Sequence, residues 1–207
     1  MDTLEAACVE SQLIAVSVND EPIGPIGKAD CHAGEGVLHR AFSLFLFNRQ
    51  GQVLLQQRSA LKPLWPGYWA NSCCSHPRWG EELPIAVSRR AREELGVMLT
   101  APLTWHFSFI YHARYLDVGS ETELCHVYSA LLEDVELHVD PNEVCAHRWI
   151  KSHELDAALR EEPDVYSPWL HREWPALRAG RVSRPIQRDS EHLRTLLGRS
   201  TSLEGPI

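Results

Sequence analysis

Apolar, β-branched and aromatic residues gather in short runs along most of this 207-residue chain, and turn-forming residues separate the runs. Runs of this length and composition predict β-strands. We expect strands at residues 13–18, 37–47, 53–57, 105–116, 123–132, 136–139 and 146–150. A polar Asn-Arg-Gln-Gly segment separates the second run from the third, so these two runs predict a hairpin. The polar stretch 28–36 is expected to be a loop.

A helical period replaces this pattern in the middle of the chain. Pro84 suits the first turn of a helix there, and Gly96 suits its C-terminal cap. Glu94 lies beside the apolar stripe of that helix, so we expect its side chain at the rim of the core. The stripe recurs every four residues, at Leu83, Val87, Ala91 and Leu95.

Two further amphipathic helices are expected at 152–160 and 167–177, and a short one at 188–197. Many strands with few helices, one of them central, indicate an α/β fold in which a mixed β-sheet sandwich carries flanking helices. The length suits one domain, and an apolar content of 44% provides a full core. We expect a flexible leader at 1–11, the domain at 12–180 and a basic tail at 181–207.

Composition excludes several classes of function. A formal charge of −8 without a long Lys/Arg run argues against nucleic acid as the main partner. No apolar stretch approaches the roughly twenty residues that span a membrane, and the acidic N-terminus does not resemble a signal peptide. Six cysteines without an export signal indicate reduced thiols and a cytoplasmic protein. The oligomeric state is left open.

The densest group of candidate functional residues lies between residues 65 and 97. Here the chain resembles two related families. Glu81 and the run Arg89-x-x-x-Glu-Glu-Leu-Gly-Val look like a degenerate Nudix box, although Ser75 replaces its first glycine and Arg90 one of its glutamates. The segment Asn-Ser-Cys-Cys-Ser-His-Pro at 71–77 resembles the Asn-Ser-x-Cys-x-His-Pro motif of type I isopentenyl-diphosphate isomerases. The resemblance extends from about residue 28 to residue 169 and implies a Nudix-like fold.

Histidines and glutamates predict a metal site. Glu121 and Glu123 are two residues apart, so on a strand both carboxylates face the same way. His32, His39 and His76 come from separate segments, and from spacing alone all of these groups are better explained as surface residues. Such a set suits a zinc- or manganese-like ion better than calcium. The resemblance implies one Mn²⁺, Zn²⁺ or Mg²⁺ at this set, with Cys74 added to it.

Basic residues at matching positions imply a diphosphate site. By resemblance, Lys28, Arg58, Lys62 and Arg90 bind the substrate diphosphate. Guanidinium groups suit this task because they bind phosphate oxygens in pairs. Glu94 would hold a Mg²⁺ that bridges to the phosphates, since hard cations prefer oxygen ligands. Without the resemblance, Arg90 and Glu94 are better explained as an ordinary ion pair on the helix surface.

The resemblance also implies a pair of groups for proton transfer. Moving a double bond by one position requires a proton to be added at one carbon and another to be removed two carbons away, through a tertiary carbocation. Cys74 would lie on one face of the substrate, and Glu123, assisted by Tyr111, on the other. Trp169 would present its ring to the cation. The structural alternative makes Cys74 and Trp169 core residues.

These features predict an isomerase that interconverts isopentenyl diphosphate and dimethylallyl diphosphate. Its partner would be a small isoprenoid diphosphate, and it would use no redox cofactor. The catalytic alternative is a Nudix-type diphosphate hydrolase, which needs more metal-binding carboxylates and has no use for Cys74. A catalytically silent Nudix-like binding module is the alternative outside catalysis. Such a module would be expected to lack Cys74, Glu123 or one of the histidines, and all of them are present.

Overall fold

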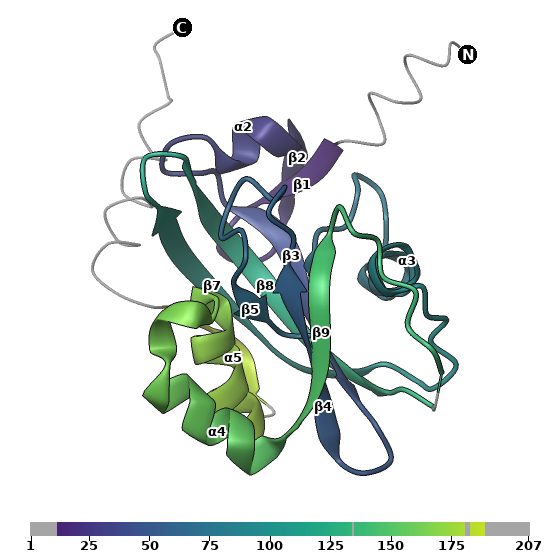
Figure 1. The fold of residues 1–207 in the computed structure, drawn as a ribbon. Coiled ribbons are helices and arrows are strands. Elements are labelled where there is room, and N and C mark those ends of the chain that lie inside the picture. Colours follow the sequence, from purple (N-terminus) through teal and green to yellow (C-terminus); the bar gives the residue numbers. More distant parts are fainter. Residues whose placement is uncertain (1–11, 134, 181–182, 189–207) are drawn as a thin grey trace, which may run out of the picture.

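The computed structural model describes residues 12–133, 135–180 and 183–188, which form one mixed β-sheet with helices on both faces (Figure 1). The strands are β1 (Gln12–Val16), β2 (Pro22–Gly27), β3 (His39–Phe47), β4 (Gln52–Arg58), β5 (Trp69–Ala70), β6 (Cys73–Ser75), β7 (Thr104–Tyr115), β8 (Gly119–Leu131), β9 (Val144–Lys151) and β10 (Ser183–Arg188). The helices are α2 (Lys28–His32), α3 (Leu83–Leu95), α4 (Ser152–Glu161) and α5 (Pro168–Arg178), with a 3-10 turn at Pro163–Val165. The predicted fold class is confirmed.

Strand β3 is the centre of the sheet. It runs parallel to β8 along its full length, from the pair His39–Glu123 to the pair Phe47–Leu131. On its other side, β8 pairs antiparallel with β7. These two registers decide which side chains of three neighbouring strands lie in one row, and the candidate site depends on them.

The predicted hairpin of β3 and β4 exists only at its turn. The two strands pair at Phe47 and Val53 and then diverge, and β4 runs antiparallel along β9 instead. The short strand β6 occupies the position that β4 leaves, with Cys74 opposite Ser43. This divergence therefore places the central cysteines next to the middle of β3.

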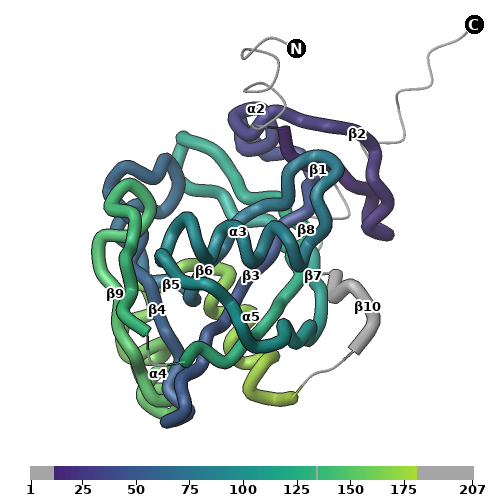
Figure 2. Tube along the Cα trace, turned by 90° about the vertical axis from the view of Figure 1, so that its right-hand side faces the viewer, coloured from purple at the N-terminus to yellow at the C-terminus, as the bar shows by residue number. Residues whose placement is uncertain are grey.

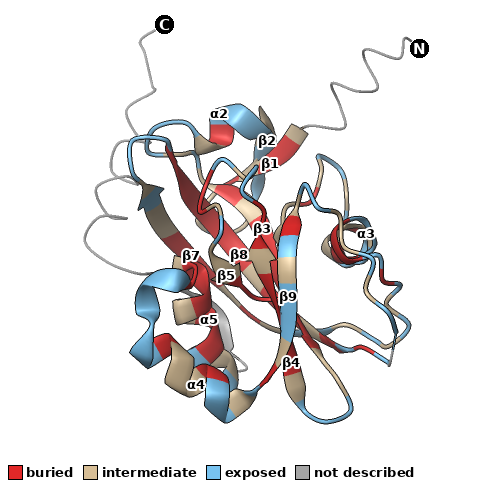
Figure 3. Ribbon diagram, in the orientation of Figure 1, coloured by how far each residue is buried: buried red, intermediate tan, exposed pale blue. Residues whose placement is uncertain are grey.

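Two apolar layers cover the sheet. Helix α3 packs on one face, where Val87, Ala91 and Leu95 are fully buried and Gly96 ends the helix in a left-handed conformation. Helices α4 and α5 cover the other face, as the two perpendicular views show (Figures 1 and 2). Burial colours mark the inward sides of all three helices (Figure 3). Glu94 was expected at the rim of the core, and it lies inside with 2% of its surface exposed.

Some predicted elements were wrong. The stretch 28–36 begins with the helical turn α2, and residues 22–27, where no strand was expected, form β2. No strand forms at 136–139, because the amides of His138 and Asp140 donate instead to the terminal carbonyls of α3, at Leu95 and Glu94. Leu137 and Val139 still pack on the core, which explains their apolar pattern. The other expected strands, and the helices at α3, α4 and α5, are confirmed with small shifts at their ends.

The chain ends bear on the predicted division into leader, domain and tail. The leader at 1–11 lies outside the described residues, as does the helix expected at 188–197 apart from its first residue. Within the predicted tail, the backbone of β10 runs parallel to β7 at the sheet edge. The division itself remains a prediction. Among the described residues, no helix is both long enough and apolar enough to cross a membrane.

Candidate active site

A row of polar side chains crosses three neighbouring strands of the sheet. Strand pairing puts His39 of β3 opposite Glu123 of β8, and Glu123 opposite Tyr111 of β7. Glu123 Oε2 accepts a hydrogen bond of 2.8 Å from the Tyr111 hydroxyl, and its Oε1 lies 2.8 Å from His76 Nε2. Glu121 faces the same way because it is two residues before Glu123. The sheet register therefore assembles residues that are far apart in the sequence.

Four of these residues form a group that could hold a metal ion. Ligand atoms of His32, His39, His76 and Glu121 all lie within 4.8 Å of one another. His39 Nδ1 is 2.7 Å from the Val37 carbonyl, and donation to that oxygen leaves the Nε2 lone pair directed at the group. The atoms His32 Nδ1, His39 Nε2 and Glu121 Oε2 are buried and have no hydrogen-bond partner among the described residues.

Unpartnered buried nitrogen and oxygen atoms are costly unless something binds them, so this donor set fits a divalent cation. Burial and repulsion from His39 and His32 hold the pKa of His76 well below its usual value, which favours the neutral, metal-binding imidazole. Burial and the neighbouring Glu123 raise the pKa of Glu121. Burial opposes the charge on Glu123 too, but the attraction of the neighbouring His39, whose Nε2 lies 3.7 Å from Glu123 Oε1, outweighs it and lowers the pKa of Glu123.

The two central cysteines face opposite layers. Cys73 is fully buried in the layer under α3, whereas Cys74 is partly buried and packs on the layer under α5. The Cys74 thiol donates to Asn71 Oδ1 over 2.6 Å, and Trp169 Nε1 donates to the same oxygen over 3.1 Å. Asn71 cannot flip without loss, because its Nδ2 donates to the carbonyls of Leu44 and Cys73. Burial raises the pKa of Cys74 well above its usual value, so the group is a thiol.

One cleft connects these groups with the predicted basic residues. Its free volume, with the open mouth included, is about 570 Å³. Cys74, Tyr111, Glu123 and Trp169 are among its lining residues, and we call the part of the cleft that they form the reacting end. Trp169 is buried, and Trp65 meets its ring edge-on with 5.5 Å between centroids. The cleft is also lined by Lys28, Arg58 and Lys62, and a smaller adjoining pocket shares Lys28 and His76 with it and includes Arg90.

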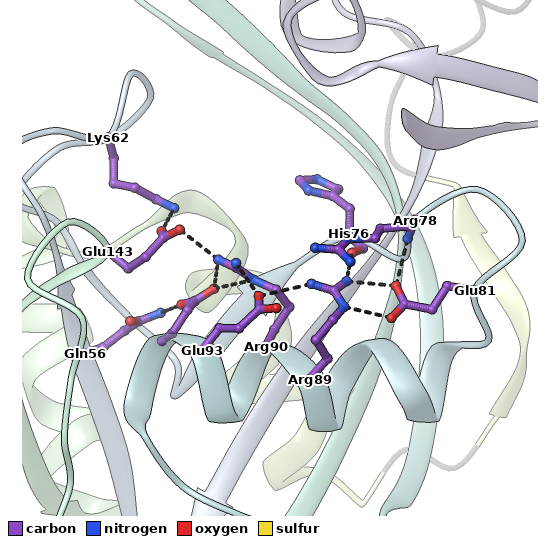
Figure 4. Close-up of polar contacts among 10 residues, drawn as sticks. Gln56, Lys62, His76, Arg78, Glu81, Arg89, Arg90, Glu93 and Glu143 are labelled. Carbon is purple, nitrogen blue, oxygen red and sulfur yellow. Dashed lines mark hydrogen bonds and ion pairs between the residues drawn. The ribbon is translucent and has the colours of Figure 1, made fainter. Parts of the chain in front are cut away.

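We call the part formed by Lys28, Lys62, Arg90, Glu94 and Glu143 the phosphate end, and all of these except Lys28 are joined by ion pairs. Glu143 forms ion pairs with both Lys62 and Arg90, and the second has a distance of 2.8 Å (Figure 4). Arg90 also donates to the buried Glu94 over 2.6 Å. The ion pair expected from sequence is thus present, but it lies below the surface. Burial and the adjacent Lys62 lower the pKa of Lys28.

Helix α3 also fixes one residue of the group that could hold a metal ion. Arg89 donates two bonds of 2.7 Å to the Glu81 carboxylate, which in turn accepts the backbone amide of Arg78 (Figure 4). A further nitrogen contact of Arg89 reaches the carbonyl of His76. The box-like residues of α3 therefore hold the segment that carries His76 in place, in addition to any role in binding phosphate.

The structure brings most predicted site residues together, with two qualifications. Arg58 lines the cleft, but its Nε and Nη2 donate to the carbonyls of Leu64 and Trp65, which engages much of its guanidinium. Cys74 and Glu123 lie outside the group of four residues that could hold a metal ion, although Glu123 contacts two of its histidines. The roles of all these residues remain predictions.

Sequence reasoning assigned no role to four residues that complete the arrangement. Asn71 stood in the quoted motif without a role, and Glu143 lies in a polar loop that offers no signal. Ser43 and Glu173 approach the thiol from behind. A signal for Glu173 existed: helical spacing places it in the buried stripe of α5 with Trp169, Leu170 and Trp174.

Comparison with known proteins agrees with this geometry. The family model for the NUDIX domain matches residues 37–171. The chain is 41% identical over 162 residues to Isopentenyl-diphosphate Delta-isomerase 1 of Photorhabdus laumondii, covering 78% of this chain and 92% of that protein. It is 45% identical to Isopentenyl-diphosphate Delta-isomerase of Nocardia farcinica, covering 72% and 83%. The crystal structure of DR0079 from Deinococcus radiodurans has a TM-score of 0.66 at 25% identity, covering 84% of this chain and 99% of that one.

Proposed function

The chain belongs to the NUDIX domain family, and from that premise we propose that it is an isopentenyl-diphosphate Delta-isomerase, which interconverts isopentenyl diphosphate and dimethylallyl diphosphate. The observation that carries the proposal is the pairing of functions in one cleft. Cys74 and the hydrogen-bonded pair of Glu123 and Tyr111 line the same cleft as the cationic side chains of Lys28, Arg58 and Lys62. A substrate with a short hydrocarbon and a diphosphate requires both ends.

Cys74 and Glu123 are the proposed proton-transfer residues. One supplies a proton to a terminal carbon of the alkene, and the other removes a proton two carbons away, so the two end the reaction with exchanged protonation states. Tyr111 holds Glu123 Oε2 by its hydroxyl, and Asn71 holds the thiol by its amide oxygen. Each group therefore enters the reaction from a fixed position.

Trp169 is the proposed neighbour of the carbocation. Its ring lines the cleft beside Cys74, and the face of an indole attracts positive charge. Asn71 binds its Nε1 and thereby fixes the ring orientation. Burial of the pocket wall limits access of water, which would otherwise capture the cation as an alcohol.

His32, His39, His76 and Glu121 are the proposed residues that hold a divalent cation, Mn²⁺, Zn²⁺ or Mg²⁺, with Glu123 and Cys74 beside it. When bound, such an ion neutralises the carboxylates and sets the proton affinity of its neighbours. His39 is held by Val37 and His76 by its contact with Glu123, so the side chains are oriented by the protein.

Lys28, Arg58, Lys62 and Arg90 are the proposed diphosphate ligands, and Glu94 the residue that holds a Mg²⁺ against the phosphates. A diphosphate offers Lys62 and Arg90 an alternative to the shared carboxylate of Glu143. The same proposal places the chain in the cytoplasm, where reducing conditions keep the Cys74 thiol available. A hydrolase has less support, because hydrolysis does not use Cys74 or its amide partner.

Proton NMR of isopentenyl diphosphate in deuterated buffer tests the proposal. Isomerisation produces new methyl signals and incorporates deuterium, and this is the expected result. Release of inorganic phosphate with no methyl signal would identify a hydrolase. Binding without either change, seen as broadened substrate signals, would identify a binding module.

A further inference from the structure

Behind Cys74 lies a buried carboxyl group that the proposed reaction does not use. Glu173 of α5 is fully buried, and the other buried residues of this helix are the apolar Trp169, Leu170 and Trp174. Its Oε1 is 2.6 Å from Ser43 Oγ, whereas its Oε2 is buried and has no hydrogen-bond partner among the described residues. A carboxyl group in an apolar stripe is costly to bury. Its presence at this position therefore calls for an explanation.

The hydroxyl of Ser43 connects this carboxyl with the thiol. Ser43 Oγ lies 3.5 Å from Cys74 Sγ, because pairing of β3 with β6 puts these residues opposite each other. The Cys125 thiol, also 3.5 Å away, can donate to the same oxygen. Ser43 has a single proton and can direct it either to Glu173 or to Cys74. The state of Glu173 decides between the two.

Hydrogen-bond accounting selects one arrangement. If Glu173 were ionised, the Ser43 hydroxyl would donate to Glu173 Oε1 and could not also donate to Cys74 Sγ. Glu173 Oε2 would then be a charged atom without a hydrogen-bond partner among the described residues. If Glu173 is neutral, its O–H donates to Ser43 Oγ, and the Ser43 O–H donates to Cys74 Sγ. The Cys74 thiol donates its own proton to Asn71 Oδ1, so every donor in this series of hydrogen bonds then has an acceptor. Burial raises the pKa of Glu173 to about 8, which agrees with the neutral form.

We propose that Glu173 is a positioning residue that acts through Ser43, directing the serine hydroxyl onto Cys74 Sγ. The inference rests on the proposed isomerase function, in which the sulfur exchanges a proton with the substrate. A donor aimed at the sulfur stabilises the negative charge that develops when the thiol proton leaves. Glu173 itself reaches neither the substrate nor the metal-binding group. Its effect should therefore appear in kcat and leave substrate binding unchanged.

Substitutions of Glu173 and Ser43 test this series of hydrogen bonds. Glu173→Met removes the directing group, and kcat should fall about tenfold, the rate equivalent of one ordinary hydrogen bond, with KM unchanged. Because Met replaces a buried carboxyl by an apolar group of similar length, this variant should unfold at the same or a higher temperature. Glu173→Gln should keep nearly full kcat. Its amide N–H can donate to Ser43, and the opposite orientation would leave both N–H groups unpaired.

A double-substitution cycle separates action through Ser43 from any other effect. Ser43→Ala alone should lower kcat by about the same factor as Glu173→Met, and adding Glu173→Met to Ser43→Ala should cause no further loss. A second tenfold loss in the double variant would overturn the proposal. So would a folded Glu173→Gln variant as slow as Glu173→Met, because charge would then be the property required.

Infrared difference spectra give a result that does not depend on turnover. The C=O band of a protonated carboxylic acid should disappear in Glu173→Gln and shift in Ser43→Ala. The S–H band of Cys74, identified by Cys74→Ala, should shift in Glu173→Met. If wild-type protein fails to isomerise the substrate, the proposed function fails while these spectra still decide the hydrogen-bond chain. Absence of a protonated carboxyl band at neutral pH would sink the Glu173 assignment alone.

Discussion

The two ends of the cleft solve opposite electrostatic problems. At the phosphate end, Glu143 lies between Lys62 and Arg90; burial would raise its pKa, but the two cations outweigh burial and lower the pKa to about 2. Behind the reacting end, Glu173 lies beside the uncharged Ser43 and Cys125, and burial raises its pKa to about 8. One carboxyl is therefore held charged and the other neutral.

The comparison shows what each end needs from the protein. In the proposed isomerase, the phosphate end receives a highly charged ligand, and carboxylates hold its cations in place until that ligand binds. The reacting end must move protons next to a hydrocarbon, so water and unneeded charge are kept out. At the reacting end, the strands β6, β7 and β8 carry Cys74, Tyr111 and Glu123, and α5 carries Trp169. The residues of the phosphate end come from the helices α2 and α3 and from two loops.

Metal removal should give the largest effect, because the metal-binding group lies beside the reacting end. We expect exhaustive chelation to abolish turnover, and Mn²⁺, Zn²⁺ or Mg²⁺ to restore it. His76→Ala should lose metal content, measured by elemental analysis, together with rate. The exposed His153→Ala in α4 is the matched control and should keep both. Full turnover by metal-free protein would contradict the assignment of His32, His39, His76 and Glu121.

Exchange of the adjacent thiols tests the reacting end next. Cys74→Ala should lower kcat by roughly a thousandfold or more while KM and metal content stay close to wild type, since a proton-transfer group is lost. Cys73→Ala is the control: the same atoms are removed one residue away, on the opposite face of β6. It should cost some stability and little rate. An inactive, folded Cys73→Ala protein would show that the motif has been read in the wrong register.

The phosphate end should respond in binding and not in the chemical step. Arg90→Lys keeps the charge but loses the paired geometry, so KM should rise roughly ten- to a hundredfold, the worth of one charge-assisted hydrogen bond of about 1.5–3 kcal/mol. The turnover number should change little because the phosphates are remote from the reacting carbons. Arg92→Lys, an exposed position on the same helix, should leave both constants unchanged. A fall in kcat alone for Arg90→Lys would break the division between the two ends.

The sequence predicted the two ends unequally. Short apolar runs located β3, β7, β8 and β9, because the composition of such a run is a local property of the sequence. The convergence of His32, His39 and His76 was not local, and only the family resemblance indicated it before the strand pairing explained it. Glu143 could not be predicted, since its partners come from a loop and a helix more than fifty residues away.

The errors have equally specific physical causes. The segment 136–139 has the composition of a strand, but its amides bond to the end of α3, and the sequence does not show which acceptors lie nearby. The hairpin prediction was correct about the turn and about both strands but wrong about their pairing, because β8 and β6 supply the partners of β3. Local pattern therefore sets where strands form, and tertiary pairing decides what they meet.

The most direct comparison of the two ends is in the pH dependence of stability. Glu143 has a lowered pKa, so the stability that it contributes should be present above its ordinary pKa of 4.5 and lost as pH falls toward about 2. Glu143→Gln should then be less stable than wild type at pH 7, and the difference should shrink in acid. Urea unfolding of the metal-loaded proteins measures it. Equal stability of both proteins at pH 7 would show that the ion pairs with Lys62 and Arg90 are offset by desolvation.

Glu173→Gln should show the opposite sign. Below the ordinary pKa of 4.5, both folded and unfolded chains carry the Glu173 proton, and pH has no effect through this group. Between 4.5 and about 8 only the folded state keeps the proton, so the free energy of unfolding of wild type falls as pH rises. The glutamine variant lacks this loss, and its advantage over wild type should grow by a few kcal/mol, at about 1.4 kcal/mol per pKa unit. The groups that face Glu173 are Ser43 from β3, Cys74 from β6, and Cys125 and Glu123 from β8, and they are shared by both proteins, so their titrations cancel in the difference. Parallel stability curves from pH 5 to pH 8 would show that Glu173 is already ionised in the folded chain, and that the two ends of the cleft do not differ in the way described.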